Sequence, residues 1–256
     1  MNLSNLIKGI LNLQKKLDKK ILPSQGLFYK DDFEIFIKKA DISDIIEYEH
    51  GYIKDDVSIV INKIKLIVEK NTYFSQDYSF NDIKSIDIIF IFLEIVRFTK
   101  GESIKIKYFN EDSGREDFIE FGSNHFNYFT IDDDIMKYYN SIEKTFEIDG
   151  YKYTIPTIGI ENSLTNYLIS KSYDQDALKY NKLSYDFTYF LGTKNHLSFS
   201  EIDNLIQIFN FDMDESEKIK VKKIIKKFLP IQKYSLKRGD KIIDMNSKID
   251  LEKIWR

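Results

Sequence analysis

An apolar stretch near residue 90 dominates the hydrophobic pattern of the chain and predicts a buried helix. Every residue of the range 88–93 is apolar, and further apolar residues follow up to Phe98, so no complete polar face remains. A helix that is apolar nearly all round must be buried on most sides. The run is shorter than the roughly 20 apolar residues that span a bilayer, and longer than most strands. We expect it to begin after an N-cap at Asn81 or Asp82 and to end at Gly101.

Within this predicted helix, Glu94 and Arg97 lie three residues apart, so they can pair on one face. A salt bridge at the rim of the core would explain the pair without any partner. A contact with another protein is the alternative, and the sequence leaves both open.

The N-terminal residues 1–22 have the spacing of an amphipathic helix. Apolar residues follow a four-three spacing from Leu3 to Ile21, which is typical of a short packing helix. This helix could dock on its own domain or on a partner. Pro23 then stops it, and Gly26 supplies a turn in the extended segment that follows.

Residues 33–71 alternate between strand and helix signals. The range 33–37 has the composition of a strand, and Asp41 starts a short helix. A longer helix, capped by Asp55 or Asp56, continues to Lys70. The apolar positions of the short helix are Ile42, Ile45 and Ile46.

Hairpin signals appear in three places after Gly101. Residues 104–108 alternate between apolar and basic, and residues 118–121 supply the returning strand. Asp149-Gly150 between two alternating runs is typical of a tight two-residue hairpin. The tail, over residues 231–245, reads as a third hairpin.

The region after Pro156 and Gly159 is mainly helical by pattern. Ser198 and Glu201 form a capping box for one of its helices. The predicted helices cover residues 162–170, 174–191, 201–209 and 214–229. We therefore predict an α+β fold: a mostly helical core with an extended N-terminal segment, small antiparallel hairpins and a helical C-terminal region. The predicted units are residues 1–22, 23–156 and 157–256.

Composition removes several classes of chemistry. The 256 residues include no Cys, which excludes disulfides and cysteine-ligated zinc, and the three His are widely separated. No Gly-rich phosphate loop and no Gly-flanked Ser nucleophile occur. Residues 1–22 lack the uninterrupted apolar core of a secretory signal, so we expect synthesis in the cytoplasm. We expect no enzyme activity, no cofactor, no metal and no membrane contact.

Charge is segregated along the chain. Residues 110–135 carry eight acids against Arg115, whereas residues 216–241 carry nine Lys and one Arg against two acids. Such segregation can steer a charged partner, although separate solvated faces explain it equally. The basic helix from Lys218 to Lys227 could bind nucleic acid or an acidic protein. The acidic run at 132–134 is interpreted as helix capping, with a cation-dependent hydrolase as the alternative.

A short motif near the N-terminus carries a resemblance to a known family. It reads Leu22-Pro23-Ser24-Gln25-Gly26-Leu27-Phe28-Tyr29. This resembles the Leu-Pro-Ser-x-Gly-x-x-Tyr opening of baseplate hub and hub-assembly proteins in T-even-type contractile-tailed phages. A strand, two helices, an apolar helix ending in Arg97-x-x-x-Gly101 and a strand pair follow in the family's order, over residues 22–125. Relatives often carry paired Cys in the strand region, and their absence here argues against a metal there.

The resemblance implies a hub subunit, or a chaperone that assembles the hub, acting through protein–protein interfaces. The expected partners are other baseplate and tail proteins in an oligomeric assembly, located in the host cytoplasm during assembly or in the virion baseplate. Nucleic-acid binding by the helix from Lys218 to Lys227 is the alternative. The residues that the resemblance and the turn chemistry single out for conformation or contact are Leu22, Pro23, Ser24, Gly26, Tyr29, Arg97 and Gly101.

Overall fold

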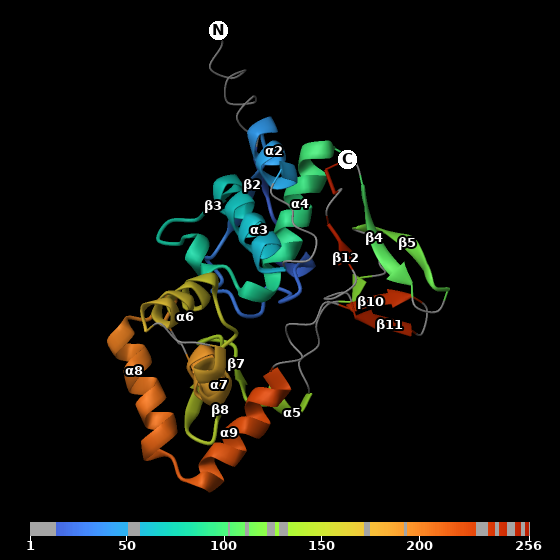
Figure 1. The fold of residues 1–256 in the computed structure, drawn as a ribbon. Helices are drawn as coiled ribbons and strands as arrows, with labels where there is room; N and C mark the ends of the chain where they lie inside the picture. Colours follow the sequence, from blue (N-terminus) through green and yellow to red (C-terminus); the bar gives the residue numbers. More distant parts are fainter. Residues whose placement is uncertain are drawn as a thin grey trace.

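The computed structural model has the predicted α+β class. It describes residues 14–50, 57–101, 103–110, 113–121, 126–127, 133–171, 175–191, 194–228, 235–238, 241–244, 249–251 and 254–255. Among these residues, eight α-helices accompany four small antiparallel sheets of three strands each (Figure 1). No helix in this part of the chain combines the length and the apolarity that crossing a membrane requires.

The first sheet lies against the N-terminal helices. It has the order β1 (Gln14–Lys16), β2 (Ile35–Lys38), β3 (Thr72–Phe74). The helix predicted over residues 3–21 is wrong where it can be checked, because residues 14–16 form β1 and residues 19–21 form the 3-10 turn η1. Pairing of β1 with β2 supplies the hydrogen bonds that a helix would otherwise make. Residues 1–13 lie outside the described residues.

Two helices connect β2 to β3 of this sheet. They are α2 (Ile42–His50) and α3 (Val57–Asn71), and both were predicted. The buried positions of α2 differ from those that its apolar residues predict. Ile42 is 76 % exposed and Ile46 is exposed as well, whereas Asp44 and Tyr48 are buried. Tyr48 reaches the C-terminal segment, where its hydroxyl donates to the Leu251 carbonyl over 3.1 Å.

The central helix α4 (Ile88–Lys100) is buried along most of its length, as its apolar pattern predicts. It begins five residues later than expected, because Ile83 and Lys84 are extended and Lys84 forms an antiparallel bridge with Thr157. The predicted N-cap residues Asn81 and Asp82 lie instead in the 3-10 turn η2 (Phe80–Asp82).

The C-terminus of α4 follows the prediction. Gly101 has φ +73°, and its N–H donates to the Arg97 carbonyl over 3.0 Å. This left-handed conformation is one that glycine adopts at little cost.

The hairpins form as predicted. The longest pairs β4 (Ile104–Asn110) with β5 (Arg115–Phe121) over seven residues each. In the tight hairpin of β8 (Thr145–Ile148) and β9 (Tyr151–Tyr153), both turn residues have positive φ, 52° for Asp149 and 81° for Gly150. Positive φ at both positions is the type I′ geometry that Asp-Gly favours.

The remaining strands complete the sheets. The short strand β7 (Tyr139–Asn140) extends the β8–β9 hairpin. The tail hairpin is β10 (Ser235–Arg238) with β11 (Lys241–Asp244), and β6 (Phe126–Asn127) pairs with β10. The last strand, β12 (Ile249–Asp250), pairs with β4.

The C-terminal helices surround the β7–β9 sheet in the lower part of Figure 1. They are α6 (Ile158–Ser170), α7 (Gln175–Leu191), α8 (Phe199–Gln207) and α9 (Glu215–Phe228), with the short α5 (Asp133–Met136) and the π-helix η4 (Ile208–Asp212). The predicted capping box of Ser198 and Glu201 is present. Gly159 lies inside α6, where a Cβ would overlap the carbonyl oxygen of Asn195.

Two large hydrophobic cores result. The first contains the β1–β3 sheet, α3, α4, the β4–β5 hairpin and the closing residues Leu251, Ile254 and Trp255. The second contains β8, β9, α7 and α9, and also takes in Phe28 and Ile86 from the N-terminal half. The division into units 1–22, 23–156 and 157–256 stays a prediction.

Candidate functional site

The segment Leu22–Tyr29, which carries the family resemblance, folds back onto the start of α4. Leu22, Pro23, Ser24 and Tyr29 are all buried. The chain reverses at Gln25 and Gly26, both with positive φ, and the Leu27 N–H donates to the Ser24 carbonyl over 3.1 Å. The side chains of this motif therefore point mainly into the protein.

Asp87 is the residue on which the segment converges. Its carboxylate accepts three hydrogen bonds: from the Ser24 N–H over 2.9 Å, from the Ser24 hydroxyl over 2.6 Å and from the Tyr29 hydroxyl over 2.6 Å. Asp87 has no exposed surface. It occupies the N-cap position of α4, yet its side chain caps none of that helix's own N–H groups. The carboxylate instead fixes a segment that lies 63 residues earlier in the sequence.

Lys84 extends this network toward the second core. Its backbone N–H donates to the Tyr29 hydroxyl over 3.1 Å, and its ammonium donates to the Ile155 carbonyl over 3.0 Å. Backbone hydrogen bonds join the same two segments, from Ser85 to Pro156 and from Ile158 to Ile83. Segments 22–29, 83–88 and 155–158 are thus held together at the junction of the two cores.

Burial shifts the pKa of both charged groups in this network. Loss of hydration raises the pKa of Asp87 to about 6, against the hydrogen bonds from Ser24 and Tyr29 and the charge of Lys84. Loss of hydration also lowers the pKa of Lys84 to about 8, against the charges of Asp87 and Asp82. In both residues, desolvation outweighs the interactions that favour the charged form.

The structure brings together only some of the singled-out residues. Ser24 and Tyr29 meet at Asp87, while Gly26 forms the turn between them. Arg97 and Gly101 lie near the other end of α4. Sequence reasoning missed Asp87 and Lys84. The available signal was an acid placed between Ile86 and Ile88, inside the apolar run.

The predicted pairing of Glu94 with Arg97 is present, with 2.7 Å between the guanidinium nitrogen and the carboxylate oxygen. Lys15 adds a second cation from β1, 3.2 Å from the same oxygen. Glu94 is buried, whereas both cations are partly exposed. The group ties the first sheet to α4 at the rim of the core.

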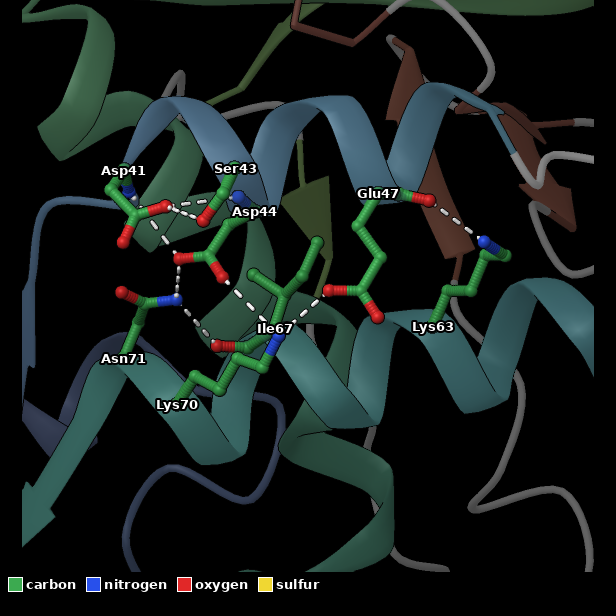
Figure 2. A network of polar contacts seen from close by, with 8 residues as sticks. All are labelled: Asp41, Ser43, Asp44, Glu47, Lys63, Ile67, Lys70 and Asn71. Atoms are coloured by element: carbon green, nitrogen blue, oxygen red, sulfur yellow. Dashed lines mark hydrogen bonds and ion pairs between the residues drawn. The ribbon is translucent and has the colours of Figure 1, made fainter.

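A second polar network joins α2 to α3, and Figure 2 shows its side chains pointing across the gap between the two helices. The buried Asp44 accepts from the Asn71 amide over 2.9 Å, and the Lys70 ammonium lies 3.6 Å from its other oxygen. One turn further along α2, Glu47 binds Lys70 at 2.7 Å and its carbonyl accepts from Lys63. Polar contacts therefore attach α2 to α3, while Ile42 and Ile46 of α2 remain exposed.

A Ser–His contact in the C-terminal region has the composition of part of a catalytic dyad. The Ser163 hydroxyl and the His196 Nδ1 are 2.7 Å apart. Ser163 is only 2 % exposed, donates to the Gly159 carbonyl and accepts from the Leu197 N–H. These contacts hold the loop at 195–197 against α6, and they leave the hydroxyl without access for a substrate.

The acidic and basic runs lie on different elements. Asp133 and Asp134 form the first turn of α5, and Asp134 pairs with Lys227 at 3.2 Å; Asp132 lies outside the described residues. Within the described ranges, no group of three or more His, Asp or Glu could hold a metal ion. On α9 the apolar residues Val221, Ile224, Ile225 and Phe228 are buried. The exposed residues of this helix include Lys220, Lys222, Lys223 and Lys226.

Comparison of the chain with protein-family models, curated proteins and solved structures gives no match. Functional interpretation therefore depends on the geometry above and on the sequence resemblance.

Proposed function

We propose that this protein is a non-enzymatic structural or assembly component of a contractile phage tail baseplate hub, acting through protein–protein interfaces. The observation that supports it most is the order of elements after the motif Leu22–Tyr29. A strand, a short helix, a longer helix, an apolar helix ended by Gly101 and a strand pair occur in the order that the resemblance implies. The short strand β3 and two 3-10 turns lie between the longer helix and the apolar helix.

The packing of the motif supports a conformational role for its residues. Because Leu22, Ser24 and Tyr29 are buried, they fix the chain at the junction of the two cores and do not present a contact surface. Partner contacts then come from elsewhere on the molecule.

The outer face of the β4–β5 hairpin is the best candidate for that contact surface. Phe109 is 48 % exposed and Phe118 is 60 % exposed. Lys107 is paired in register with Phe118 and forms an ion pair with Glu116 at 2.6 Å, so charged and aromatic groups share this face. The hairpin lies at one side of the molecule in Figure 1. Exposed aromatics beside charged groups are the composition that anchors protein interfaces.

An affinity pull-down tests the proposal. Tagged protein would be captured from infected cells after nuclease treatment, and the captured proteins identified by mass spectrometry. We expect hub and tail proteins in the wild-type sample. Absence of every tail protein would overturn the proposal.

A matched pair of variants adds residue-level information to the pull-down. The double variant Phe109→Ser, Phe118→Ser should lose the captured tail proteins. The control Ile169→Ser changes a side chain that is 72 % exposed on α6 and should retain them. Thermal unfolding of each purified variant would show that both remain folded.

Nucleic-acid binding by α9 is the second candidate. It is supported by the four exposed lysines of that helix, none of which forms an ion pair within the described residues. Contacts with phosphates release counterions, so binding would fall steeply with salt. Replacing Lys222, Lys223 and Lys226 with Gln should then reduce both affinity and the salt slope in a DNA-binding titration. No binding at low salt would remove this candidate.

A further inference from the structure

A cavity of about 110 Å³ lies beside the Asp87 network, and Lys84 forms part of its wall. Aromatic rings supply another part of the lining. Tyr29 and Phe33 stack with ring centroids 4.7 Å apart, and Tyr78 meets Phe33 edge-on at 4.9 Å. The lining therefore combines aromatic rings with the side chain of a buried lysine.

The acids that line this cavity already have partners. Asp82 accepts from the N–H and the hydroxyl of Ser79, at 2.7 and 2.9 Å, and also from the Asn195 amide. Glu143 is paired with Lys152 at 2.6 Å. Within the described residues, neither carboxylate lies at ion-pair distance from Lys84.

The lysines that line the cavity differ in whether they have an acidic partner. Lys144 pairs with Asp31 at 3.0 Å, on the exposed side of the lining. Lys84 is only 8 % exposed, and within the described residues its ammonium has one acceptor, the Ile155 carbonyl, and no carboxylate at ion-pair distance. Lys30, also in the lining, is exposed and forms no ion pair with a described residue.

We propose that this cavity binds a carboxylate, supplied by an acidic side chain or by the C-terminus of a partner protein, through the Lys84 ammonium and with Lys30 at the rim. An ammonium group has three donors, of which Lys84 uses one on a described acceptor. Charge-assisted hydrogen bonds to a carboxylate are stronger than those to a neutral carbonyl. The rings of Tyr29, Phe33 and Tyr78 would pack against the apolar part of the ligand.

The electrostatics of Lys84 support this assignment. Burial lowers its pKa to about 8 even though the charges of Asp87 and Asp82 oppose the shift. The protein therefore replaces only part of the lost hydration of the ammonium, and the Asp87 carboxylate accepts its hydrogen bonds from Ser24 and Tyr29. An anion in the cavity would supply the missing interaction. This inference does not depend on the baseplate assignment, because it uses only the cavity and its lining.

The first experiment compares acetate with acetamide, which has the same shape but no charge, by NMR titration of the ¹⁵N-labelled full chain at pH 7. We expect acetate to shift signals of residues lining the cavity and acetamide to shift them at least tenfold more weakly. Equal responses to the two ligands would overturn the proposal. Inorganic phosphate binding in place of acetate would overturn the carboxylate assignment.

Two variants then test Lys84 itself. Lys84→Gln keeps a donor for the Ile155 carbonyl but removes the charge, and it should weaken acetate binding at least tenfold. Lys226→Gln makes the same change on α9, outside the lining, and should bind acetate as the wild type does. Unchanged binding by Lys84→Gln would contradict the proposal.

A measurement on the wild type covers the case in which Lys84→Gln fails to fold. Acetate affinity should fall as the pH rises from 7 to 9, because Lys84 loses its proton across this range. The other charged groups at the cavity or near Lys84 are Lys30, Asp82, Asp87, Glu143 and Lys144. Acetate affinity that stays constant from pH 7 to 9 would overturn the role of Lys84.

Discussion

Two buried aspartates, Asp87 and Asp44, are satisfied in different ways. Asp87 accepts three hydrogen bonds from Ser24 and Tyr29, and within the described residues no Lys or Arg lies at ion-pair distance from it. Asp44 accepts from the Asn71 amide and faces the ammonium of Lys70, whose side chain is nearly half exposed. The first network is enclosed by protein, whereas the second reaches solvent through Lys70.

This difference indicates how each network responds when it is broken. Water can replace a lost partner at the edge of α2 and α3, because Lys70 already contacts solvent. Around Asp87 little surface is exposed to water, since Asp87, Ser24 and Tyr29 are all buried. A buried donor left without an acceptor costs its full desolvation penalty.

The largest expected effect comes from removing the two carboxylates in turn. Asp87→Ala would orphan three buried donors and remove the charge that supports Lys84, so we expect a loss of about 3 kcal/mol in the free energy of unfolding. Asp44→Ala should cost about 1 kcal/mol, because Asn71 keeps the Ile67 carbonyl as an acceptor. Urea unfolding measures both, and equal losses would show that the two networks do not differ in the way proposed.

Gly26 and Gly101 provide a second pair, because Gly26 forms the turn between Ser24 and Tyr29 and Gly101 ends α4. Both have φ near +75°, but a Cβ on Gly26 would lie 3.0 Å from the Lys19 Cβ, whereas a Cβ on Gly101 meets nothing within 4 Å. Gly101→Ala should therefore cost about 1 kcal/mol, from backbone strain alone. Gly26→Ala should cost about 2 kcal/mol, because steric overlap is added.

The same glycine positions connect stability with assembly. Gly26→Val should also disrupt particle assembly if the baseplate proposal holds. Normal particles from that variant would contradict the importance of the turn. A thermal melt in which Gly101→Ala unfolds at a lower temperature than Gly26→Ala would contradict the steric argument.

A smaller effect concerns pH. The folded-state pKa of Asp87 is raised from 3.8 to about 6, so the folded protein binds this proton more tightly than the unfolded chain. The stability from this group is fully present below about pH 4 and is lost as the pH rises through 6. Between pH 5 and 7 the wild type should lose about 1 kcal/mol that Asp87→Asn does not lose. Urea unfolding at each pH measures this difference, and identical pH profiles for the wild type and Asp87→Asn would contradict the prediction. Asp44→Asn serves as the control.

The smallest expected effect is on the exposed face of α2. Ile42→Ser should change the free energy of unfolding by less than about 0.5 kcal/mol, because Ile42 is largely in solvent and polar contacts attach the helix. Tyr48→Ser, on the buried face, should cost several-fold more. A large loss for Ile42→Ser in a thermal melt would mean that the isoleucine face of α2 is covered.

Elements that depend on local chemistry were predictable. Asp149-Gly150 specified a tight turn, Ser198 with Glu201 specified a helix start, and Gly101 specified a helix end. In each case the deciding hydrogen bonds or dihedral angles lie within a few residues. The motif Leu22–Tyr29 was also found from sequence, although its target Asp87 was not.

The sequence by itself determined the α+β class, the buried character of α4 and the hairpins, because these follow from the period of apolar residues and from turn residues. Tertiary structure alone decided that residues 14–16 form a strand, that α4 starts at Ile88 and that α2 buries Asp44 instead of Ile42. These outcomes depend on partners far away in the chain, such as β2 for β1 and Thr157 for Lys84. A local pattern contains no information about which distant group will satisfy a backbone or a carboxylate, so packing decides it.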